Sequence, residues 1–283
     1  MKNKVTLLDL QKKKKEKIPI VMVTAYDYPS AKLADEAGVD MILVGDSLGM
    51  VVLGYDSTIQ VTVDDMVHHT KAVTRGVEHA FVVADLPFLT VHLGVESTLK
   101  AAGRLMQEGL AHGVKVEGGS EVAPQVKACV QAGIPVVGHL GLLPQSVHQL
   151  GGYRVQAKEL ASAQKLLKDA KALEEAGACA IVLECVPGLL ATLVSETLTI
   201  PTIGIGAGAG CDGQVLVYHD LLQYAAKLAP KFVKAYADVG TVIRDAIAAY
   251  AREVRDRSFP GPEHTFSLDE SVLAALREAE GLQ

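Results

Sequence analysis

The sequence predicts an α/β protein built as a single (β/α)8 TIM barrel, and three observations support this fold class. The 283 residues (29.9 kDa) are long for one ordinary domain and suit one eight-stranded barrel. Apolar residues make up 49 % of the chain, aromatic residues only 5 %, and Trp is absent, a composition typical of Val/Ile/Leu-rich parallel strands covered by Ala-rich helices. Eight short β-branched runs alternate with helical patterns, which favours parallel βαβ units closed into a barrel.

The eight predicted strands are apolar runs that end in a polar residue or glycine. Helical stretches with 3.6-residue spacing separate most of them, for example Val95–Glu108 and Ala157–Ala176. Several stretches end in a glycine suited to a helix C-cap, such as Gly38 and Gly177. The predicted strands are Ile18–Ala25, Asp40–Val44, Phe81–Ala84, Val114–Val116, Ile134–Gly138, Ala180–Leu183, Thr202–Ile205 and Val215–Tyr218.

Both ends of the chain are predicted to add helices to this one domain, which covers residues 1–283. Residues 1–17 form an N-terminal helical extension that carries a run of five lysines. We interpret the run as a solvated helix face, with anion or partner binding as the alternative. Residues 238–283 contain two helical patterns, Thr241–Arg257 and Leu268–Glu280, which cap or extend the barrel or lie at an oligomer contact.

Charge, hydropathy and cysteine usage exclude several classes of protein. The formal charge of −6 disfavours binding to nucleic acid or to an anionic membrane surface. The longest apolar stretch, Val186–Gly210, contains Glu196 and several Gly and Pro residues, so we predict no membrane span. Four cysteines without a C-x-x-C pair argue against zinc and against a disulfide framework. Together with the missing apolar signal segment, this predicts a cytoplasmic protein.

Acidic residues follow five of the first six predicted strands, where barrels of this kind place their active sites. Carboxylates that converge on one end of a barrel repel one another unless a cation or shared protons offset their charge. An all-oxygen set without adjacent His or Cys suits Mg²⁺ or Mn²⁺ better than zinc. The residues at the eight strand ends are Asp27, Asp46, Asp85, Glu117, His139, Glu184, Gly206 and, last, His219 with Asp220.

The fourth strand places a lysine beside this cluster. The period of two puts Lys115 and Glu117 on one face and Val116 on the other. Because the valine belongs against the outer helices, Lys115 and Glu117 are predicted to point into the barrel. A lysine there requires a carboxylate or a substrate anion as its partner. The alternative is a buried Lys115–Glu117 ion pair that binds no ligand.

Glu184 ends the sixth strand, across the ring from the other acids. This separates a predicted metal set, Asp46, Asp85 and Glu117, from a predicted proton-transfer group, Glu184. The alternative role of Glu184 is that of a helix N-cap or a salt-bridge partner.

Two further signals are weaker. The segment 204–209 matches a loose G-x-G-x-x-A dinucleotide pattern, but no helix pattern opens behind it. We interpret it as a tight loop in which Gly206 and Gly208 permit a ligand to approach the backbone, with a nucleotide site as the alternative. His139 lines the pocket or forms a hydrogen bond within the barrel, and the sequence does not favour one over the other.

The sequence resembles the ketopantoate hydroxymethyltransferase (3-methyl-2-oxobutanoate hydroxymethyltransferase) family from about Thr24 to Phe266. The motifs occur in the family's order, which makes the match specific. Two departures are Leu143, where Thr is common, and the stretch after Asp220. The matching segments are 23–27 (VTAYD), 44–49 (VGDSLG), 84–88 (ADLPF), 115–119 (KVEGG), 138–141 (GHLG), 144–146 (PQS), 151–153 (GGY), 183–185 (LEC), 204–208 (GIGAG), 212–214 (DGQ) and 230–232 (PKF).

The resemblance implies a metal-dependent (β/α)8 enzyme of pantothenate (coenzyme A) biosynthesis, usually a homodecamer in bacteria. Its substrates would be 3-methyl-2-oxobutanoate and 5,10-methylenetetrahydrofolate, and its product 2-dehydropantoate. The resemblance assigns Glu184 as the proton acceptor, Asp46, Asp85 and Glu117 as ligands of Mg²⁺, and Asp46, Ser47, Asp85 and Lys115 as contacts of the oxo acid.

The residues suit this chemistry. Proton removal from C3 of a 2-oxo acid builds negative charge on its oxygen atoms, which Mg²⁺ and Lys115 would stabilise.

One alternative function is that of a Mg²⁺-dependent oxo-acid C–C lyase or mutase of the isocitrate lyase type. Such lyases carry a reactive Cys in a Lys/Cys/Gly/His loop, and none follows the fourth or fifth predicted strand. The other alternative is a non-catalytic barrel that binds metabolites.

Overall fold

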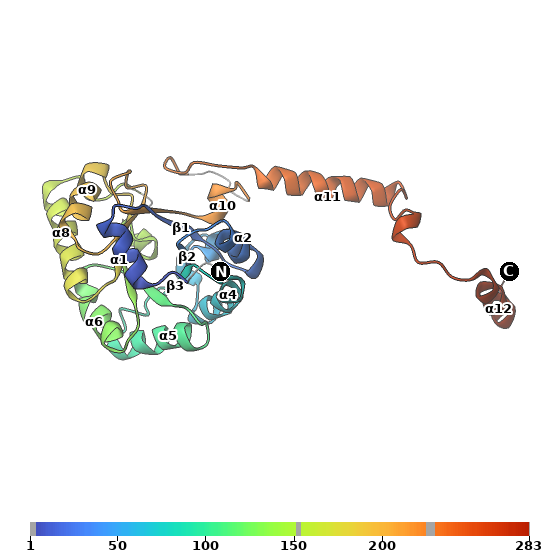
Figure 1. Cartoon of the computed structure of the whole chain (residues 1–283), viewed down its shortest axis with the longest axis horizontal. Helices are drawn as coiled ribbons and strands as arrows, with labels where there is room; N and C mark the ends of the chain where they lie inside the picture. The colour runs from blue at the N-terminus through green and yellow to red at the C-terminus, as the bar shows by residue number, and fades with distance from the viewer. Residues whose placement is uncertain (1–3, 151–153, 225–229, 283) are drawn as a thin grey trace. The chain divides into compact units, whose positions relative to one another are not determined.

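The computed structural model describes residues 4–150, 154–224 and 230–282, and the chain divides into two compact units, 1–237 and 238–283. Figure 1 shows the chain coloured from the N-terminus to the C-terminus, with β1, β2 and β3 labelled. The first unit is a closed barrel of eight parallel strands in chain order. This confirms the predicted (β/α)8 class. The strands are β1 (Ile20–Thr24), β2 (Met41–Val44), β3 (Phe81–Asp85), β4 (Gly113–Glu117), β5 (Val136–Gly141), β6 (Ala180–Glu184), β7 (Thr202–Ile205) and β8 (Gly213–Leu216).

All eight predicted strands occur, and most of their ends differ from the prediction by one to three residues. The seventh has the predicted bounds, whereas β5 runs three residues further than expected and so includes His139. The eighth prediction was wrong by two residues at both ends. Gly213 pairs with Ile20 at the start of β1, and the Tyr218 N–H donates to Thr24 Oγ1 instead of to a neighbouring strand. Pairing with β1, rather than local hydrophobicity, therefore sets the position of β8.

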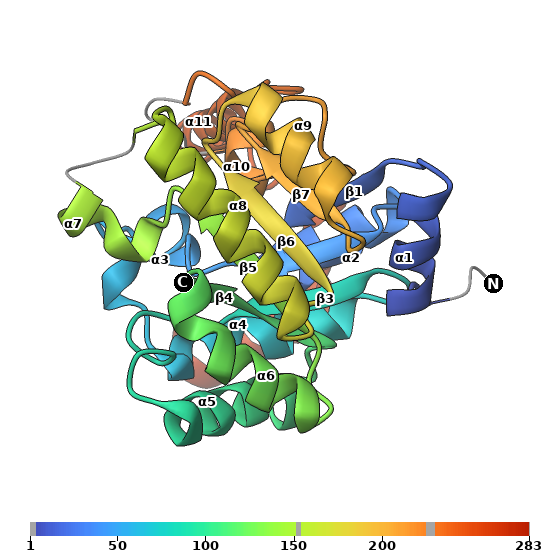
Figure 2. The ribbon, with the colours of Figure 1, turned by 90° about the vertical axis from the view of Figure 1, so that its left-hand side faces the viewer.

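Helices surround the strands of the first unit (Figure 2). The predicted helices 95–108 and 157–176 are observed as α5 and α8, close to the expected bounds. The β7–β8 connection contains no helix among the described elements. The helices are α1 (Leu7–Lys15), α2 (Tyr28–Glu36), α3 (Leu48–Val51), α4 (Val63–Gly76), α5 (Val95–Gln107), α6 (Ala123–Gln131), α7 (Val147–Leu150), α8 (Leu160–Glu175), α9 (Gly188–Thr197) and α10 (Tyr218–Leu221), with 3-10 turns η1 (Thr58–Gln60), η2 (Ser120–Val122) and η3 (Pro144–Ser146).

The strand residues alternate between two buried layers. In β4, Val114 and Val116 pack with residues of the surrounding helices, as the period of two predicts. The barrel interior holds a separate apolar cluster that includes Phe81 and Val83 of β3. Asp85 lies two residues further along the same face and ends that strand. The interior is thus apolar along the strands and becomes polar at their carboxyl ends.

Helix α1 packs at the opposite, N-terminal end of the barrel. Leu10 is 1 % exposed and belongs to the interior apolar cluster. Lys13 Nζ lies 2.7 Å from Asp40 Oδ1, and Lys14 Nζ lies 2.7 Å from Asp212 Oδ2. The interpretation of the lysine run as a solvated face was therefore wrong for Lys13 and Lys14. Their charges stabilise the contact between α1 and the strand entrances.

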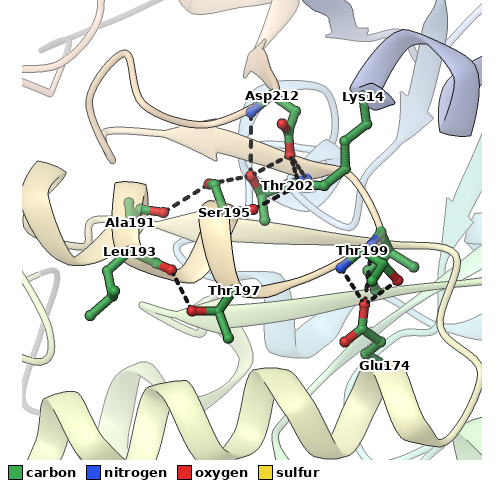
Figure 3. Close-up of polar contacts among 10 residues, drawn as sticks. Lys14, Glu174, Ala191, Leu193, Ser195, Thr197, Thr199, Thr202 and Asp212 are labelled. Carbon is green, nitrogen blue, oxygen red and sulfur yellow. Dashed lines mark hydrogen bonds and ion pairs between the residues drawn. The ribbon is translucent and has the colours of Figure 1, made fainter. Parts of the chain in front are cut away.

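Asp212 is the centre of a polar network at this end of the barrel (Figure 3). Its Oδ2 accepts hydrogen bonds from Lys14 Nζ and from the Thr202 N–H at 2.8 Å and hydroxyl at 3.1 Å. The Thr202 and Ser195 hydroxyls also contact each other, and the Ser195 hydroxyl donates to the Ala191 carbonyl at 2.8 Å. The network joins α1, α9, β7 and the loop before β8.

The second unit contains α11 (Val239–Arg255), η4 (Pro262–His264) and α12 (Glu270–Glu280). Both helices lie within two residues of their predicted bounds, and Asp238 caps α11 by accepting from the Thr241 N–H. Neither helix contains a buried residue. Exposed apolar side chains on α11 recur at helical spacing, at positions 243, 247, 250 and 254. Within the described parts of the chain, no helix is long and apolar enough to span a membrane.

Candidate active site

Four predicted acidic residues lie at the carboxyl end of the barrel. Asp85, Glu117 and Glu184 are the last residues of β3, β4 and β6, and Asp46 follows β2 by two residues. The three residues of the predicted metal set, Asp46, Asp85 and Glu117, are each at most 5 % exposed, whereas 15 % of the Glu184 side chain is exposed. Barrel geometry therefore brings these residues to the end of the fold where active sites occur.

Asp46 and Asp85 are buried next to each other. The Asp46 N–H donates to Asp85 Oδ2 at 3.0 Å, while Asp85 Oδ1 faces the ammonium of Lys115. Burial, with the charges of Asp85 and Glu117, raises the pKa of Asp46 well above its usual range. Burial also raises the pKa of Asp85, although Lys115 opposes the shift. The pair thus favours protonation or an additional cation.

Lys115 supplies a permanent positive charge to this cluster. Its Nζ lies 3.0 Å from Asp85 Oδ1 and 3.1 Å from His139 Nδ1. Burial opposes its charge, but Asp85, Glu117 and Asp46 outweigh burial and raise the pKa of Lys115. The ion-pair partner is thus Asp85 of the neighbouring strand, not Glu117 as in the ligand-free alternative that the sequence left open.

Gln145 links two of the acids and was not singled out by the sequence analysis. Its Nε2 donates to Asp46 Oδ2 at 2.8 Å and to the Leu86 carbonyl at 3.0 Å, and its N–H donates to Glu117 Oε2 at 3.1 Å. That N–H, with His139 and Lys115, outweighs burial and lowers the pKa of Glu117. The signal available in the sequence was the segment 144–146, which carries part of the family resemblance.

Tyr26 is a second residue that the sequence analysis missed. Its hydroxyl lies 2.8 Å from Ser47 Oγ, next to Asp46 in the chain. The ring is only 2 % exposed, and burial raises the pKa of the phenol, so Tyr26 stays neutral. The signal available in the sequence was the segment 23–27, which carries part of the family resemblance, but only the fold places the Tyr26 hydroxyl beside Ser47.

His139 connects the acid cluster to Glu184. It is 3 % exposed, and its Nε2 lies 3.2 Å from Glu184 Oε2, while Nδ1 lies 3.4 Å from Glu117 Oε1. Burial and Lys115 oppose protonation, but the carboxylates of Glu117 and Glu184 outweigh them and raise the pKa of His139. Four neighbouring strands, β3 to β6, therefore carry one continuous chain of polar contacts.

Other predicted strand-end residues lie outside this network. Asp27 is the N-cap of α2, where it accepts from the Ser30 N–H at 2.8 Å. Gly206 has φ of +63°, and a Cβ there would lie 2.8 Å from the Phe232 ring. The Gly208 carbonyl accepts from Gln214 Nε2, so this loop is a tight turn that leads directly into β8. His219 stacks on Tyr224, with ring centroids 5.1 Å apart.

The charges of the cluster suit a divalent cation. Three buried carboxylates (Asp46, Asp85 and Glu117) face one ammonium, that of Lys115, which leaves two negative charges unbalanced when all are ionised. Asp85 Oδ1 and Glu117 Oε1 are buried and face Lys115 and His139 in ion-pair contacts, but neither oxygen accepts a hydrogen bond of good geometry from the described residues. Hard oxygen donors of this kind fit Mg²⁺ or Mn²⁺. Among the described residues, no three His, Cys, Asp or Glu side chains form a ready-made metal site, so the metal set stays a prediction.

Comparison with known protein families identifies the chain. The model of the ketopantoate hydroxymethyltransferase family matches residues 4–262. The chain belongs to this family. It is an enzyme, a hydroxymethyltransferase, as the resemblance in the sequence predicted. The family match includes every residue of the polar network described above.

Individual relatives agree over nearly the whole length. The chain is 62 % identical over 258 residues to the 3-methyl-2-oxobutanoate hydroxymethyltransferase of Geobacillus kaustophilus, with 91 % of this chain and 92 % of the relative covered. It is 58 % identical over 269 residues to the enzyme of the same name from Thermoanaerobacter sp. (strain X514), covering 95 % and 98 % of the two chains.

Solved structures with a similar fold are much more distant in sequence. A phosphonopyruvate hydrolase has a TM-score of 0.60 and 14 % identity, with 98 % of this chain and 96 % of that chain covered. A 2,3-dimethylmalate lyase of the PEP mutase/isocitrate lyase superfamily has a TM-score of 0.58 and 18 % identity, with 97 % and 95 % covered. These similarities show that the ketopantoate hydroxymethyltransferase fold shares its barrel architecture with that superfamily.

Proposed function

We propose that the chain transfers the one-carbon unit of 5,10-methylenetetrahydrofolate to 3-methyl-2-oxobutanoate, giving 2-dehydropantoate, the first committed step of pantothenate and coenzyme A biosynthesis. The observation that carries the proposal is the buried set Asp46, Asp85, Glu117 and Lys115, with a more exposed carboxylate, Glu184, reached through His139. A cationic binding site next to a partly exposed base is what enolisation of a 2-oxo acid requires.

Asp46, Asp85 and Glu117 would hold Mg²⁺, or Mn²⁺ in its place. When bound, the ion supplies Lewis-acid stabilisation of the negative charge that develops on the oxo acid. Gln145 holds the side chain of Asp46 by a hydrogen bond and that of Glu117 by its backbone N–H, so both carboxylates are oriented before a ligand arrives. The chain's own contribution to the metal site is thus a preorganised set of hard donors.

Lys115 and Ser47 would bind the oxo acid itself. Lys115 is a buried ammonium, and such a charge attracts the substrate carboxylate and the developing oxyanion. Ser47 is half-buried beside Asp46, and Tyr26 fixes the position of its hydroxyl at 2.8 Å. These two residues orient the substrate, with Asp46 and Asp85 beside them.

Glu184 would take the proton from C3 of 3-methyl-2-oxobutanoate. The C3–H electron pair then forms the enolate, whose C3 attacks the methylene carbon of the folate. Both bonds from the methylene carbon to the folate nitrogens break, one as the bond to C3 forms and the other as water supplies the hydroxyl group of the product. The proton taken from C3 and the remaining proton of water restore the two N–H groups of tetrahydrofolate, so the reaction balances. Glu184 is the one acid of the four with an appreciably exposed side chain, 15 %, so it can reach a ligand.

The test is proton NMR of 3-methyl-2-oxobutanoate in D2O with the protein and Mg²⁺, first without folate. We expect loss of the C3 proton signal, and formation of ketopantoate after 5,10-methylenetetrahydrofolate is added. Glu184→Gln should slow both by roughly 10²–10⁴-fold, the range for removal of a general base. Glu175→Gln, an exposed residue at the end of α8, is the matched control and should retain full activity.

Metal removal, the Glu184→Gln variant and an assay for C–C cleavage each test a different part of the proposal. EDTA should abolish exchange, and Mg²⁺ or Mn²⁺ should restore it; full activity of metal-free protein would exclude the metal role of the carboxylates. Near-normal exchange by Glu184→Gln would exclude Glu184 as the base. Cleavage of a C–C bond in an oxo acid, without folate, would instead support the lyase alternative that the sequence left open.

We also propose that the enzyme is a cytoplasmic homodecamer. The exposed apolar side chains of α11 and α12 support self-association, because contiguous apolar surface on a soluble protein marks interaction sites. Light scattering after size-exclusion chromatography measures the mass directly. A mass of ten chains agrees with the proposal, and a monomer contradicts it.

A further inference from the structure

His139 is the buried residue at which the two halves of the site meet. Nδ1 faces Lys115 Nζ at 3.1 Å, and Nε2 faces Glu184 Oε2 at 3.2 Å. Strand pairing sets this position, because His139 is in register with Glu117 of β4 on one side and Val182 of β6 on the other. Along β6, Val182 and Glu184 share the inward face, so Glu184 is the next inward residue after the one paired with His139.

The contacts determine which nitrogen of His139 carries a proton. Lys115 Nζ also forms an ion pair with Asp85 Oδ1 at 3.0 Å, so it faces the ring as an ammonium, which donates and cannot accept. Nδ1 of a neutral imidazole therefore accepts from Lys115, and the proton lies on Nε2. If the ring is instead doubly protonated, Nε2 still carries a proton. In both states an N–H group points from Nε2 toward Glu184.

That N–H group lacks a well-aligned acceptor. Nε2 is buried and forms no hydrogen bond of good geometry with the residues that the structure describes, although Glu184 Oε2 lies at 3.2 Å. A buried donor without an acceptor lowers the stability of the fold. Catalytic hydrogen bonds are often poorly aligned before the substrate binds and improve afterwards. A small rotation of the Glu184 side chain would satisfy the donor.

The backbone of Glu184 is already held, so only its side chain is free to turn. The Leu142 N–H donates to the Glu184 carbonyl at 2.8 Å. Gly141 has φ of +96° and approaches so closely that a Cβ there would lie 2.2 Å from the same oxygen. Because the main chain cannot move, a directional contact from His139 is sufficient to set the carboxylate.

We propose that His139 is a positioning residue that donates from Nε2 to Glu184 and aims the free carboxylate oxygen at C3 of the substrate. The inference rests on the proposed function, in which Glu184 is the base. It assigns to Lys115 a second task, since its contact with Nδ1 orients the imidazole. His139 does not touch the reacting atoms and acts only through Glu184.

Two substitutions separate the two contacts of the ring. The amide of asparagine occupies the place of Nδ1, so His139→Asn retains an acceptor for Lys115 and loses the donor to Glu184. The amide of glutamine reaches the place of Nε2, so His139→Gln retains that donor. Both variants are compared with wild type in the deuterium-exchange assay with Mg²⁺, and their melting temperatures are recorded.

We expect His139→Asn to lower kcat for exchange about 10- to 100-fold, the scale of a misplaced catalytic group, with little change in KM. We expect the kcat of His139→Gln to stay within about fivefold of wild type. Equal losses in both variants, or no loss in His139→Asn, would overturn the inference. Where both variants melt far below wild type, exchange is compared at a temperature at which circular dichroism shows each of them folded, and the same two criteria apply.

The control Glu184→Gln distinguishes the inference from the proposed function. If Glu184→Gln keeps exchange, the base is wrongly assigned and the proposed function fails at that step. If Glu184→Gln is inactive and His139→Asn has normal kcat, only the positioning role fails. A loss in His139→Asn that His139→Gln restores supports the inference, because a merely structural role would not depend on which nitrogen is replaced.

Discussion

The two ends of the barrel each hold a polar network, partly buried at the N-terminal end and fully buried around Asp85 at the carboxyl end, and the networks differ in how well their groups are hydrogen-bonded. At the N-terminal end, Asp212 Oδ2 accepts from Lys14 and from both the N–H and hydroxyl of Thr202. At the carboxyl end, Asp85 Oδ1, Glu117 Oε1 and His139 Nε2 are buried and lie in ion-pair contacts with Lys115, His139 and Glu184, but none of the three forms a hydrogen bond of good geometry with the described residues. The first network forms its hydrogen bonds within the protein alone, whereas the second leaves three buried atoms in charge contacts that a ligand can supplement.

The difference follows from what each network does. A fully paired buried network stabilises and orients the elements that it joins. Buried polar groups without well-aligned hydrogen bonds lower the stability of the fold, and they persist at sites where a ligand supplies further charge or hydrogen bonds. Substitutions at the carboxyl end should therefore reduce activity with little change in stability. Substitutions at the N-terminal end should reduce stability with little change in the activity of the folded protein.

The largest expected effect is on activity in Asp46→Asn. Loss of one carboxylate from the metal set should reduce kcat/KM about 100- to 1,000-fold, the range for one preorganised electrostatic contact. The free energy of unfolding in EDTA should rise by about 1 kcal/mol, because a buried charge beside Asp85 is removed. Urea denaturation and steady-state kinetics measure both, and destabilisation by more than about 2 kcal/mol would show that Asp46 is structural.

Addition of Mg²⁺ should have the next largest effect. A ligand that binds only the folded protein stabilises it by about 2.7 kcal/mol at a concentration of 100 times Kd. Thermal unfolding should therefore shift upward in wild type and not in Asp46→Asn. An equal shift in both proteins would place the cation elsewhere.

At the N-terminal end, Asp212→Ala should destabilise the protein by about 2 kcal/mol, because Lys14 and Thr202 lose their shared acceptor. Activity of the folded fraction should not change. Lys12→Met is a matched control on the same helix, since Lys12 is exposed and its contact with Glu16 is 3.9 Å; it should change stability by less than about 0.5 kcal/mol. Loss of activity in folded Asp212→Ala would contradict the separation of the two ends.

The smallest expected effect is on the stability of a variant of Asp169, an α8 residue whose carboxylate is fully paired and contacts η2 after β4. Lys165 contacts it, and the Ser120 hydroxyl and N–H donate to it at 2.8 Å and 3.2 Å, so they outweigh burial and lower its pKa. The ionised Asp169 carboxylate therefore stabilises the folded protein at pH values above the ordinary carboxyl pKa of 3.8. This stabilisation is lost as the pH falls through the lowered pKa of Asp169.

Asp169→Asn should reduce the free energy of unfolding by about 1 kcal/mol at neutral pH, with allowance for solvent screening of Lys165. The difference from wild type should disappear in acid, because the protonated carboxyl of Asp169 is then as uncharged as the amide that replaces it. Urea denaturation at a series of pH values measures this, and a difference that grows in acid would refute it.

Much of the site could be predicted because its residues end strands. Periodicity of two placed Lys115 and Glu117 inside the barrel and Val116 outside, and the structure confirms this. Asp27 followed the same pattern and is nevertheless a helix cap, since an acid after a strand serves equally well at the start of the next helix. A strand end by itself does not distinguish these two uses.

The sequence by itself determined the number of strands, the barrel class and the family, because alternation, helix spacing and motif order are local properties of the chain. Only the tertiary structure decided the partners: Gln145 on Asp46, Tyr26 on Ser47, Lys14 on Asp212 and His139 on Glu184. The residues of these pairs lie between 21 and 198 positions apart in the chain. Closure of the barrel brings them together, and side-chain chemistry at such separations leaves no periodic signal in the sequence.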